Sequence, residues 1–382
     1  MSAASPDPGV SQDAPVVFWD GYGLDNPHSG VGYHGAQLYK NLQQVGIQPT
    51  VVGDYELAKY FDQTIGSVVL SNAQKAKLLW PSLVYRKIKA HSRRTKRPQI
   101  YHGLSNINLP VLGRGRAVDR FIITIHDLIP FYPDADVSKA YRRQFQFMLK
   151  RVIRKADRIV AVSQWTAAEI RRLFPWATDK VVVIPNGRPD LPSSDVAMLS
   201  APPAAGQVQI LTVSRCEGYK RLPLVAEILN RSRDIQAVVV TDKSGKKQLL
   251  NDYFHLIQLG KLQLRTGVHE DELQRLFYES DMYVHPSLYE GYCLPAAEAL
   301  SLGKPVIYTS GSGIDEVCGT EVCTALTRDA SPLEWRDAIL AKREELTDRQ
   351  CQAGILAHCR TLPDWKSTAI EVKKLYNGVI PQ

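Results

Sequence analysis

Short apolar runs rich in β-branched residues alternate along this chain with segments whose apolar residues recur every three or four positions. The runs in the first half that predict strands are APVVFW, QPTVVG, GSVVL, PQIYHG, RFIITIHD, DRIVAVS and KVVVIPNG. The second half continues with VQILTVSR, IQAVVVTD, KLQLRTG, DMYVHPS and KPVIYTS. Helical patterns lie between the strands, for example at 35–45, 72–90, 138–156 and 164–173. Such alternation predicts parallel sheets covered by helices on both faces.

A stretch rich in Pro, Ser and Ala, residues 188–207, separates the two halves. The 382 residues exceed one ordinary hydrophobic core. We therefore predict an α/β protein with two doubly wound, Rossmann-like domains at 16–190 and 207–360, joined by a linker at 191–206. A ligand cleft is expected at the carboxyl ends of both sheets. Residues 1–15 are expected to be disordered, without the apolar core of a signal peptide, and no run is long enough for a membrane span.

The charge is unevenly distributed. The chain carries a net charge of +8, and its first 200 residues hold 26 Lys/Arg against 16 Asp/Glu. No acidic residue occurs between Asp62 and Asp119, and seven Lys/Arg crowd into Arg86–Arg97, after Trp80 and Tyr85. An anionic membrane surface and a solvated helix face are both consistent with this stretch, whereas nucleic acid is disfavoured. All six cysteines follow residue 215 without metal-ligand spacing, which indicates free thiols in a reducing cytoplasm.

Two glutamates frame the most specific pattern. Glu290 follows the predicted strand DMYVHPS on a Gly-containing turn, and Glu298 lies about two turns into the next helix. Carboxylates at such positions accept sugar hydroxyls through charge-assisted hydrogen bonds, and the backbone N–H groups between them can face an anion. The pattern fits a ligand that joins a sugar, a ribose and a phosphate, as a nucleotide sugar does. Two solvated surface glutamates are the alternative.

Cationic and polar side chains follow two other predicted strands. Arg215 closes QILTVS and Lys220 follows five residues later, so the two can bind a diphosphate. Surface charges around a turn are the alternative. His126 closes RFIITI, where it can bond a sugar hydroxyl or, as a core histidine, the backbone.

Two formal motifs point elsewhere. Gly30, Gly32 and Gly35 spell G-x-G-x-x-G with Asp54 nineteen residues later, as in a dinucleotide site. About ten residues separate these glycines from the preceding strand, however, whereas the fingerprint needs its first glycine directly after it. A glycine-rich loop that admits a phosphate or acceptor is the alternative. The Asp134/Asp136 pair spells the D-x-D of metal-using sugar transferases, but helix capping is the simpler role at that position.

Taken together, these segments resemble the retaining glycosyltransferases of family four, which have the two-domain GT-B architecture. The resemblance covers nearly the whole chain. It rests on SGVG (29–32), IHDLIPF (125–131), RIVAVSQWTAAEI (158–170), VVVIPNG (181–187), VSRCEGYKRL (213–222), GVHEDELQRLFYESDMYVHPSLYEGYCLPAAEAL (267–300) and GKPVIYTSGSGIDEV (303–317).

The resemblance implies roles for the charged residues. Glu290 would contact hydroxyls of the donor sugar and Glu298 the ribose. Arg215 and Lys220 would bind the diphosphate, and His126 would contact the donor sugar near its reacting carbon. The catalytic set would therefore be His126, Arg215, Lys220 and Glu290.

The resemblance also implies roles for the backbone and the terminus. Gly30 and Gly32 would let the first domain close on donor and acceptor. The backbone of Gly291, Tyr292, Cys293 and Leu294 would meet the sugar and phosphate. Residues 361–382 would form a terminal helix that crosses back to the first domain. The chain departs from the family where Cys293 replaces a glycine and where Arg221 replaces an asparagine.

The implied reaction is a retaining, metal-independent transfer of a hexose from a nucleotide-diphosphate sugar, with GDP-mannose favoured over UDP-hexoses. The leaving diphosphate can itself take the acceptor's proton while protein cations stabilise its charge. The expected acceptor is a lipid-linked glycan in surface polysaccharide synthesis, and the expected location is the cytoplasm or the inner face of the plasma membrane. Three alternatives remain: a nucleotide-sugar epimerase, an NAD-dependent dehydrogenase using Gly30, Gly32, Gly35 and Asp54, and a non-catalytic scaffold recruited through Arg86–Arg97.

Overall fold

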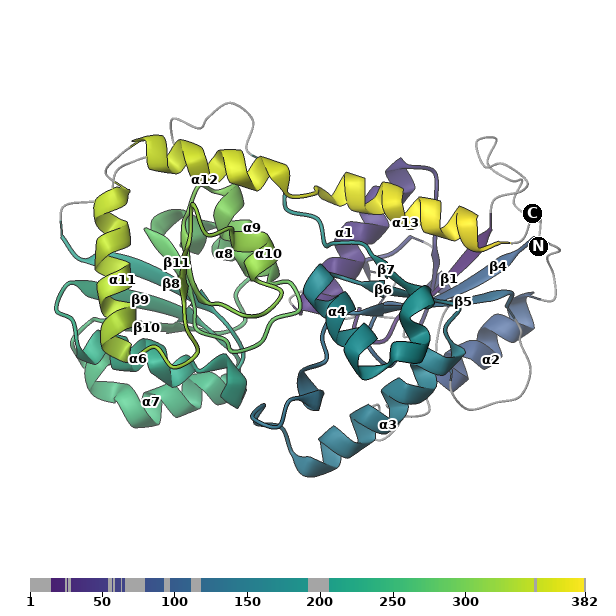
Figure 1. Ribbon diagram of the computed structural model, residues 1–382, viewed down its shortest axis with the longest axis horizontal. Helices are drawn as coiled ribbons and strands as arrows, with labels where there is room; N and C mark the ends of the chain where they lie inside the picture. Colours follow the sequence, from purple (N-terminus) through teal and green to yellow (C-terminus); the bar gives the residue numbers. More distant parts are fainter. Residues whose placement is uncertain are drawn as a thin grey trace. The chain divides into compact units, whose positions relative to one another are not determined.

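The computed structural model describes residues 15–24, 26, 29–53, 57, 59–62, 64–65, 80–92, 97–110, 118–191, 206–346 and 349–380. The predictions for residues 1–14, the run GSVVL, Asp54, Arg93–Lys96 and most of the linker lie outside this part. The chain divides into two compact units. Unit 1 comprises residues 1–128, 140–187 and 365–382, and unit 2 comprises 129–139 and 188–364 (Figure 1).

Unit 1 is built on a parallel sheet in the order β3-β2-β1-β4-β5-β6-β7. Its strands are β1 (Val16–Asp20), β2 (Thr50–Val52), β3 (Thr64–Ile65), β4 (Gln99–Gly103), β5 (Arg120–Ile125), β6 (Arg158–Ala161) and β7 (Val181–Val183). Its helices are α1 (Gly30–Gln44), α2 (Trp80–Ser92), α3 (Lys139–Lys155), α4 (Gln164–Leu173), η3 (Pro175–Lys180) and α13 (Trp365–Val379). Helix α13, from the end of the chain, packs against α1 near its beginning.

Unit 2 is built on a second parallel sheet in the order β10-β9-β8-β11-β12-β13. Its strands are β8 (Val208–Val213), β9 (Ile235–Val240), β10 (Leu262–Arg265), β11 (Met282–His285), β12 (Val306–Thr309) and β13 (Thr324–Leu326). Its helices are η2 (Ile129–Phe131), η4 (Gly218–Lys220), α6 (Leu222–Asn230), α7 (Lys243–Gln258), α8 (Glu270–Glu279), α9 (Leu294–Ser301), α10 (Asp315–Cys318), α11 (Pro332–Glu345) and α12 (Arg349–Thr361).

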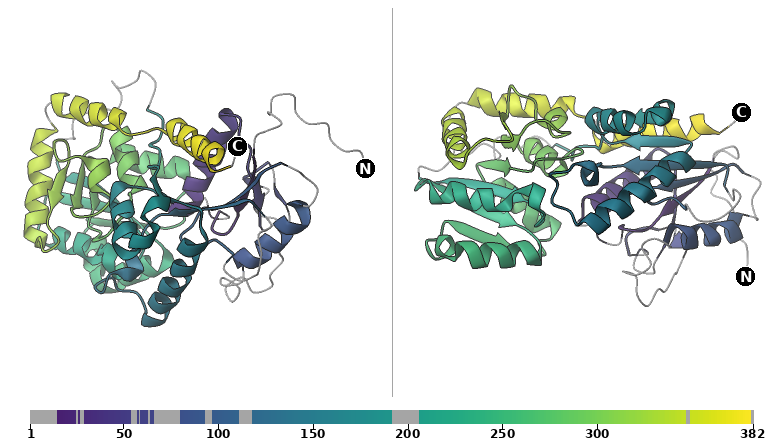
Figure 2. Two further views of the ribbon diagram at one scale, coloured as in Figure 1. Left: turned by 45° about the vertical axis from the view of Figure 1, so that its right-hand side comes forward. Right: turned by 60° about the horizontal axis from the view of Figure 1, so that its bottom comes forward.

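The prediction of two doubly wound α/β domains is confirmed. Helices lie on both faces of each sheet (Figure 2), and the central strands β5 and β11 are almost wholly buried, which explains their continuous apolar runs. The strand order reverses between β1 and β4 in unit 1 and between β8 and β11 in unit 2. Ligands of such sheets bind at the carboxyl ends of the strands beside this reversal. The cleft expected between the domains stays a prediction.

Three local expectations need correction. Helix α1 begins at Gly30 rather than residue 35, because the Ser29 side chain accepts the N–H of Gly32 and caps the helix. The expected glycine-rich loop is therefore the first turn of a helix. Strand β13 was not predicted, since TAL is too short and too exposed to give an apolar run. Tyr141, which the three-to-four-residue spacing of apolar positions in 138–156 places on the apolar face of α3, is 48% exposed.

Candidate active site

The predicted donor residues of unit 2 lie around the carboxyl ends of two neighbouring strands. Arg215 comes two residues after β8, and Lys220 ends the short helix η4. Glu290 follows β11 on a turn that leads to α9, which carries Glu298. Strand β8 pairs with β11 in the sheet, so the fold brings the cationic and the acidic loop together although 70 residues separate them along the chain.

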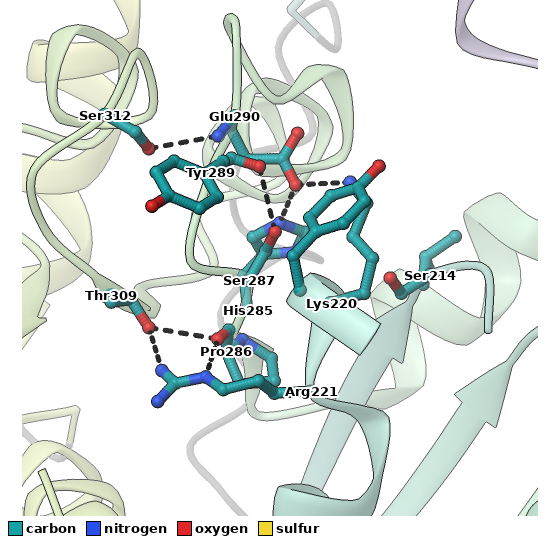
Figure 3. Close-up of polar contacts among 12 residues, drawn as sticks. Ser214, Lys220, Arg221, His285, Pro286, Ser287, Tyr289, Glu290, Thr309 and Ser312 are labelled. Carbon is teal, nitrogen blue, oxygen red and sulfur yellow. Dashed lines mark hydrogen bonds and ion pairs between the residues drawn. The ribbon is translucent and has the colours of Figure 1, made fainter. Parts of the chain in front are cut away.

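An ionic cluster of Lys220, His285 and Glu290 is the centre of this region (Figure 3). Lys220 Nζ donates to Glu290 Oε1 over 2.6 Å. His285 Nε2 donates to the same oxygen over 2.5 Å, while its Nδ1 lies 2.8 Å from the hydroxyl of Tyr283. The side chains of Lys220 and Glu290 are only 16% and 12% exposed. Charge-assisted bonds of this kind fix the carboxylate in one orientation.

The cluster stabilises the charged forms of both partners. Burial by itself raises the pKa of the Glu290 carboxyl, yet Lys220 and His285 together hold that pKa well below its usual range. Burial likewise lowers the pKa of Lys220, but the Glu290 carboxylate more than offsets this and raises it above its ordinary value. Glu290 is therefore an anion and Lys220 a cation at neutral pH.

The second carboxylate oxygen of Glu290 is available to a ligand. Both hydrogen bonds of the side chain end on Oε1, and Oε2 has no partner among the described residues. An ionised carboxylate oxygen accepts two hydrogen bonds. Oε2 can therefore receive neighbouring hydroxyls of a sugar, as the resemblance implies.

The turn that carries Glu290 is fixed by its backbone. The N–H of Glu290 donates to Ser312 Oγ over 3.2 Å, and the N–H of Gly313 donates to the carbonyl of Glu290 over 2.8 Å. A Cβ at Gly313 would lie 2.1 Å from the carbonyl oxygen of Gly291. Only glycine allows this close approach, so Gly313 holds the donor turn against the loop after β12.

Arg221, one departure from the family, has a structural role. It adopts the left-handed conformation at φ 50° between η4 and α6. Its guanidinium donates to Pro286 O and Thr309 Oγ1 over 2.7 and 2.6 Å (Figure 3). It also donates to Arg328 O over 2.7 Å. It thus joins Thr309, the last residue of β12, to residues that follow β11 and β13 at the carboxyl edge of the sheet.

Three residues in or just before α9 have unusual environments. Cys293, which replaces a glycine, is buried at φ 80°, a conformation that favours glycine. The buried hydroxyl of Tyr292 has no partner among the described residues. One turn into α9, burial raises the pKa of Glu298 to about 8, with a further contribution from Glu270. Without a ligand, Glu298 is therefore mostly protonated at neutral pH.

Arg215, the other predicted diphosphate cation, and Cys293 make no recorded hydrogen bond to the ionic cluster through their side chains. Arg215 is exposed, and its side chain makes no hydrogen bond or ion pair among the described residues. Cys293 Sγ lies within 4.8 Å of ligand atoms of His285 and Glu290, but burial raises the pKa of its thiol well above the ordinary value. The His285–Glu290 distance of 2.5 Å is also shorter than the roughly 3.3 Å between two ligands of a tetrahedral zinc ion. His285 and Glu290 are therefore joined by a direct hydrogen bond, with the Cys293 thiol nearby.

The predicted residues of unit 1 lie at its own sheet and first helix. His126 follows β5, and its Nε2 donates to Leu104 O over 2.8 Å, the contact that a core histidine makes. Burial lowers the pKa of this imidazole, so it is neutral at pH 7. At Gly32 a Cβ would lie 1.9 Å from Asn26 O, whereas at Gly30 it would meet nothing. The donor contacts of His126, Gly30 and Gly32 stay predictions.

The sequence interpretation missed four residues of this region. His285 was read as part of an apolar strand, because a single histidine in such a run gives no sign of a carboxylate partner. Ser312 and Gly313 lie in the SGSG turn of the quoted family segment, and only the close contact with Gly291 reveals their role. Arg328 follows β13, a strand without a clear pattern.

Solved structures with the same fold are GT-B glycosyltransferases. The sucrose-phosphate synthase of Thermosynechococcus elongatus superposes with a TM-score of 0.75 at 16% identity, covering 96% of this chain and 99% of the other. Anabaena Alr3699/HepE, solved in complex with UDP, superposes with a TM-score of 0.70 at 16% identity over 96% and 100% of the two chains. The fold of this chain is therefore GT-B.

The sequence then gives the family. Residues 28–189 match Glycosyltransferase Family 4, and residues 200–347 match Glycosyl transferases group 1. The chain belongs to the family-four-like glycosyltransferases, as its motifs predict.

Two curated relatives are mannosyltransferases. The MMP alpha-(1->4)-mannosyltransferase of Mycolicibacterium hassiacum is 24% identical over 68% of this chain and 65% of its own length. The O-antigen chain mannosyltransferase B of Escherichia coli is 27% identical over 62% of this chain and 64% of its own. The match thus spans a little under two thirds of these relatives.

Proposed function

We propose that this chain is a retaining hexosyltransferase that moves a sugar from a nucleotide diphosphate to a glycan acceptor in polysaccharide synthesis. The observation that carries the proposal is the Lys220–Glu290 pair. It sets one cation for a diphosphate beside one carboxylate whose Oε2 is available to sugar hydroxyls. The UDP complex of the Anabaena relative supports a nucleotide as the ligand.

In the proposed reaction, the bond between the anomeric carbon and the diphosphate breaks, and the acceptor oxygen forms the new bond on the same face. The acceptor's proton passes to the leaving diphosphate. Lys220 and Arg215 stabilise the charge that develops there, and Glu290 orients the sugar through its hydroxyls. The reaction needs no covalent protein intermediate.

We favour mannose as the transferred sugar and GDP as the leaving nucleotide. The names of the mannosyltransferase relatives support this choice, and a lipid-linked glycan is the proposed acceptor because one relative builds O-antigen chains. The test is a panel of GDP- and UDP-sugars with a glycan acceptor, scored by released nucleotide. Release that requires both donor and acceptor is expected; conversion of the donor without any acceptor would instead identify an epimerase.

The two glutamates should act on different parts of the donor. Glu298→Ala is expected to weaken binding of the bare nucleotide by about 1.5–3 kcal/mol, the value of a charge-assisted hydrogen bond. Glu290→Ala should lower turnover and leave that affinity nearly unchanged. Calorimetric titration with GDP and UDP measures both, and equal losses of affinity in the two variants would contradict the division.

We also propose that transfer needs no metal ion, since protein cations can meet the diphosphate. Activity should survive EDTA apart from modest effects on product release. Complete loss of activity that manganese or magnesium restores would falsify this part of the mechanism.

The proposed location is the inner face of an anionic membrane. Among the described residues no helix is long and apolar enough to cross a bilayer, so the proposal concerns surface contact. Its basis is the acid-free stretch with Arg86–Arg97, of which part is described, together with α3, which also contains no acidic residue. Phe147 on α3 and Trp176 on η3 are 55% and 49% exposed, and arginines lie over both rings. Exposed aromatic and basic groups suit an interfacial contact.

Binding to phosphatidylglycerol vesicles tests this location. Changing Arg93, Arg94, Lys96 and Arg97 to Gln, or the α3 residues Arg143, Lys150, Arg151 and Arg154 to Gln, should release the protein, since each cation contributes about 1 kcal/mol near an anionic surface. The matched control on α7 changes Lys243, Lys246 and Lys247 to Gln. Equal binding by all variants would assign these stretches to solvated helix faces.

A further inference from the structure

A short segment from the first half of the sequence belongs to unit 2. The chain leaves unit 1 after Leu128 and returns to it at Ala140, and residues Ile129–Lys139 between these points pack with unit 2. We call Ile129–Lys139 the docking arm. It contains Asp134 and Asp136, which spell the D-x-D motif.

The docking arm holds Tyr289, the residue before Glu290. The ring of Tyr132 stacks on the ring of Tyr289 with centroids 4.2 Å apart and planes at 12°. The hydroxyl of Tyr289 donates to Asp134 Oδ1 over 2.5 Å. Burial, followed by this hydrogen bond, raises the pKa of Tyr289, so the hydroxyl remains a donor.

Arg328 completes this contact from the other side. Its guanidinium lies 4.3 Å from the centroid of the Tyr289 ring, and Nη1 donates to the Tyr289 hydroxyl over 3.0 Å. Its Nη2 donates to Leu288 O over 3.0 Å, and the same Nη1 lies 3.8 Å from Asp134 Oδ2. Tyr289 is thus fixed by stacking, by a cation over its ring and by two hydrogen bonds to its hydroxyl.

The docking arm also touches the loop that carries the diphosphate cation. A Cβ at Gly218 would lie 2.4 Å from Asp136 Cβ, so Asp136 packs directly on the start of η4, which ends at Lys220. In addition, the N–H of Leu288 donates to Tyr219 O over 2.8 Å. The two carboxylates of the D-x-D motif therefore each contact one of the two donor loops.

We propose that Asp134 is a positioning residue for sugar transfer. Through Tyr289 and Arg328 it fixes the turn of Glu290, and so the direction in which Glu290 Oε2 meets the donor sugar. The inference rests on the proposed function. A metal-binding role for Asp134 is disfavoured, because its carboxylate already accepts the Tyr289 hydroxyl and faces the cation of Arg328.

The carboxylate of Asp134 is too exposed to act mainly through stability. Its side chain is 54% exposed, and that of Arg328 is 41% exposed. Ion pairs of that exposure contribute little to folding. Tyr289, in contrast, is 3% exposed. A change at Asp134 should therefore appear in the geometry of the turn more than in the unfolding of the protein.

The test compares Asp134→Ala, Asp134→Asn and Tyr289→Phe in the full chain. Asp134→Ala is expected to lower kcat for nucleotide release about three- to tenfold, in the lower part of the range of coupling between contacting residues. The affinity for GDP or UDP should stay within about twofold, because Lys220 and Glu298 are untouched. Asp134→Asn should restore most of the rate, since the amide oxygen can still accept the Tyr289 hydroxyl.

Two controls separate positioning from a general structural effect. In a Tyr289→Phe background, Asp134→Ala should cost little further activity, because the bond between them is already lost. Asp337→Asn, which removes another exposed acid bonded to an arginine, should leave the rate unchanged. Additive losses, or equal losses in Asp337→Asn, would overturn the proposal.

Amide hydrogen exchange gives a readout that does not depend on finding the donor. Asp134→Ala should speed exchange at Glu290 and Gly313, whose N–H groups hold the turn, and Asp337→Asn should not. Unchanged exchange there overturns the positioning role even if the protein is a transferase. Faster exchange supports it even if no donor of the panel is turned over, in which case only the proposed function fails. Loss of activity in Asp134→Asn as deep as in Asp134→Ala, with wild type dependent on manganese, would instead assign Asp134 to a metal.

Discussion

Each unit places a buried histidine at a comparable point of its sheet, but the surroundings are charged in unit 2 and neutral in unit 1. In unit 2, His285 at the end of β11 contacts an ionised carboxylate that also binds Lys220. In unit 1, the side-chain bonds of His102, near the end of β4, go to neutral groups within the described part of the chain, Tyr376 and Thr124. The same fold therefore produces a charged site in one unit and a neutral polar cluster in the other.

The neutral cluster of unit 1 is extensive. Burial, with a smaller contribution from His126, lowers the pKa of His102 to about 3. Burial also lowers the pKa of His34, whose Nδ1 lies 2.8 Å from Asn186 Oδ1. The Tyr376 hydroxyl accepts from Trp19 Nε1 over 3.0 Å. The cluster in unit 1 is therefore uncharged at pH 7, in contrast to the ionic cluster of Lys220, His285 and Glu290 in unit 2.

The largest expected effect comes from removing the cation of unit 2. Lys220→Ala should reduce turnover by about 3–4 kcal/mol in transition-state free energy, a hundredfold or more. It should also destabilise the fold by on the order of 2 kcal/mol, less than for an isolated buried pair because His285 still donates to Glu290. Steady-state nucleotide release and denaturant unfolding measure the two effects.

Arg215→Ala is the matched control for Lys220. Arg215 is exposed and has no ion-pair partner among the described residues, so this variant should lose turnover, again by about a hundredfold, while its unfolding stays within about 0.5 kcal/mol of wild type. Near-wild-type turnover in both variants, with the fold intact, would remove the diphosphate assignment.

A smaller effect should follow from removing the Tyr376 hydroxyl from the neutral cluster of unit 1. Tyr376→Phe leaves Trp19 Nε1 and His102 Nδ1 without their buried partner, which should cost about 1–3 kcal/mol in unfolding free energy. Affinity for GDP or UDP should not change, because the charged site lies in unit 2. Tyr60→Phe, at a side chain that is 46% exposed in the same unit, is the control. If Tyr376→Phe lowers nucleotide affinity as well as stability, the neutral cluster of unit 1 is coupled to the charged site of unit 2.

The sequence predicted the charged region far better than the neutral one. Lys220 and Glu290 stood out because charged residues directly after apolar strands are conspicuous, and the pairing of β8 with β11 brings them together. The predicted helix at 164–173 matches α4, and the structure shows that a Ser163 cap fixes its start. The neutral cluster joins Trp19 to Tyr376, 357 positions apart, and no periodicity reports such a contact. The docking arm was likewise hidden, because chain order assigns it to the first half.

Glu298 lies in the charged region of unit 2, yet it resembles the histidines of unit 1 because it is neutral without a ligand. Its pKa of about 8 means that ribose hydroxyls, which donate to a carboxylate, must bind with release of a proton. Affinity for GDP or UDP should therefore rise with pH, by at most about tenfold per unit, and level off above 8.

The contribution of Glu298 to folding stability depends on pH with the opposite sign. The folded state keeps a proton that the unfolded state loses near 4.5, so this contribution to stability is complete below that pH and is lost as pH rises through 8. Calorimetric titration at pH 6.5, 7.5 and 8.5, in two buffers of different ionisation enthalpy, measures both affinity and proton release. Glu298→Gln should weaken binding and abolish the slope. An affinity in wild type that is equal at all three pH values, with no proton released, would mean that Glu298 does not bind the ribose as an anion.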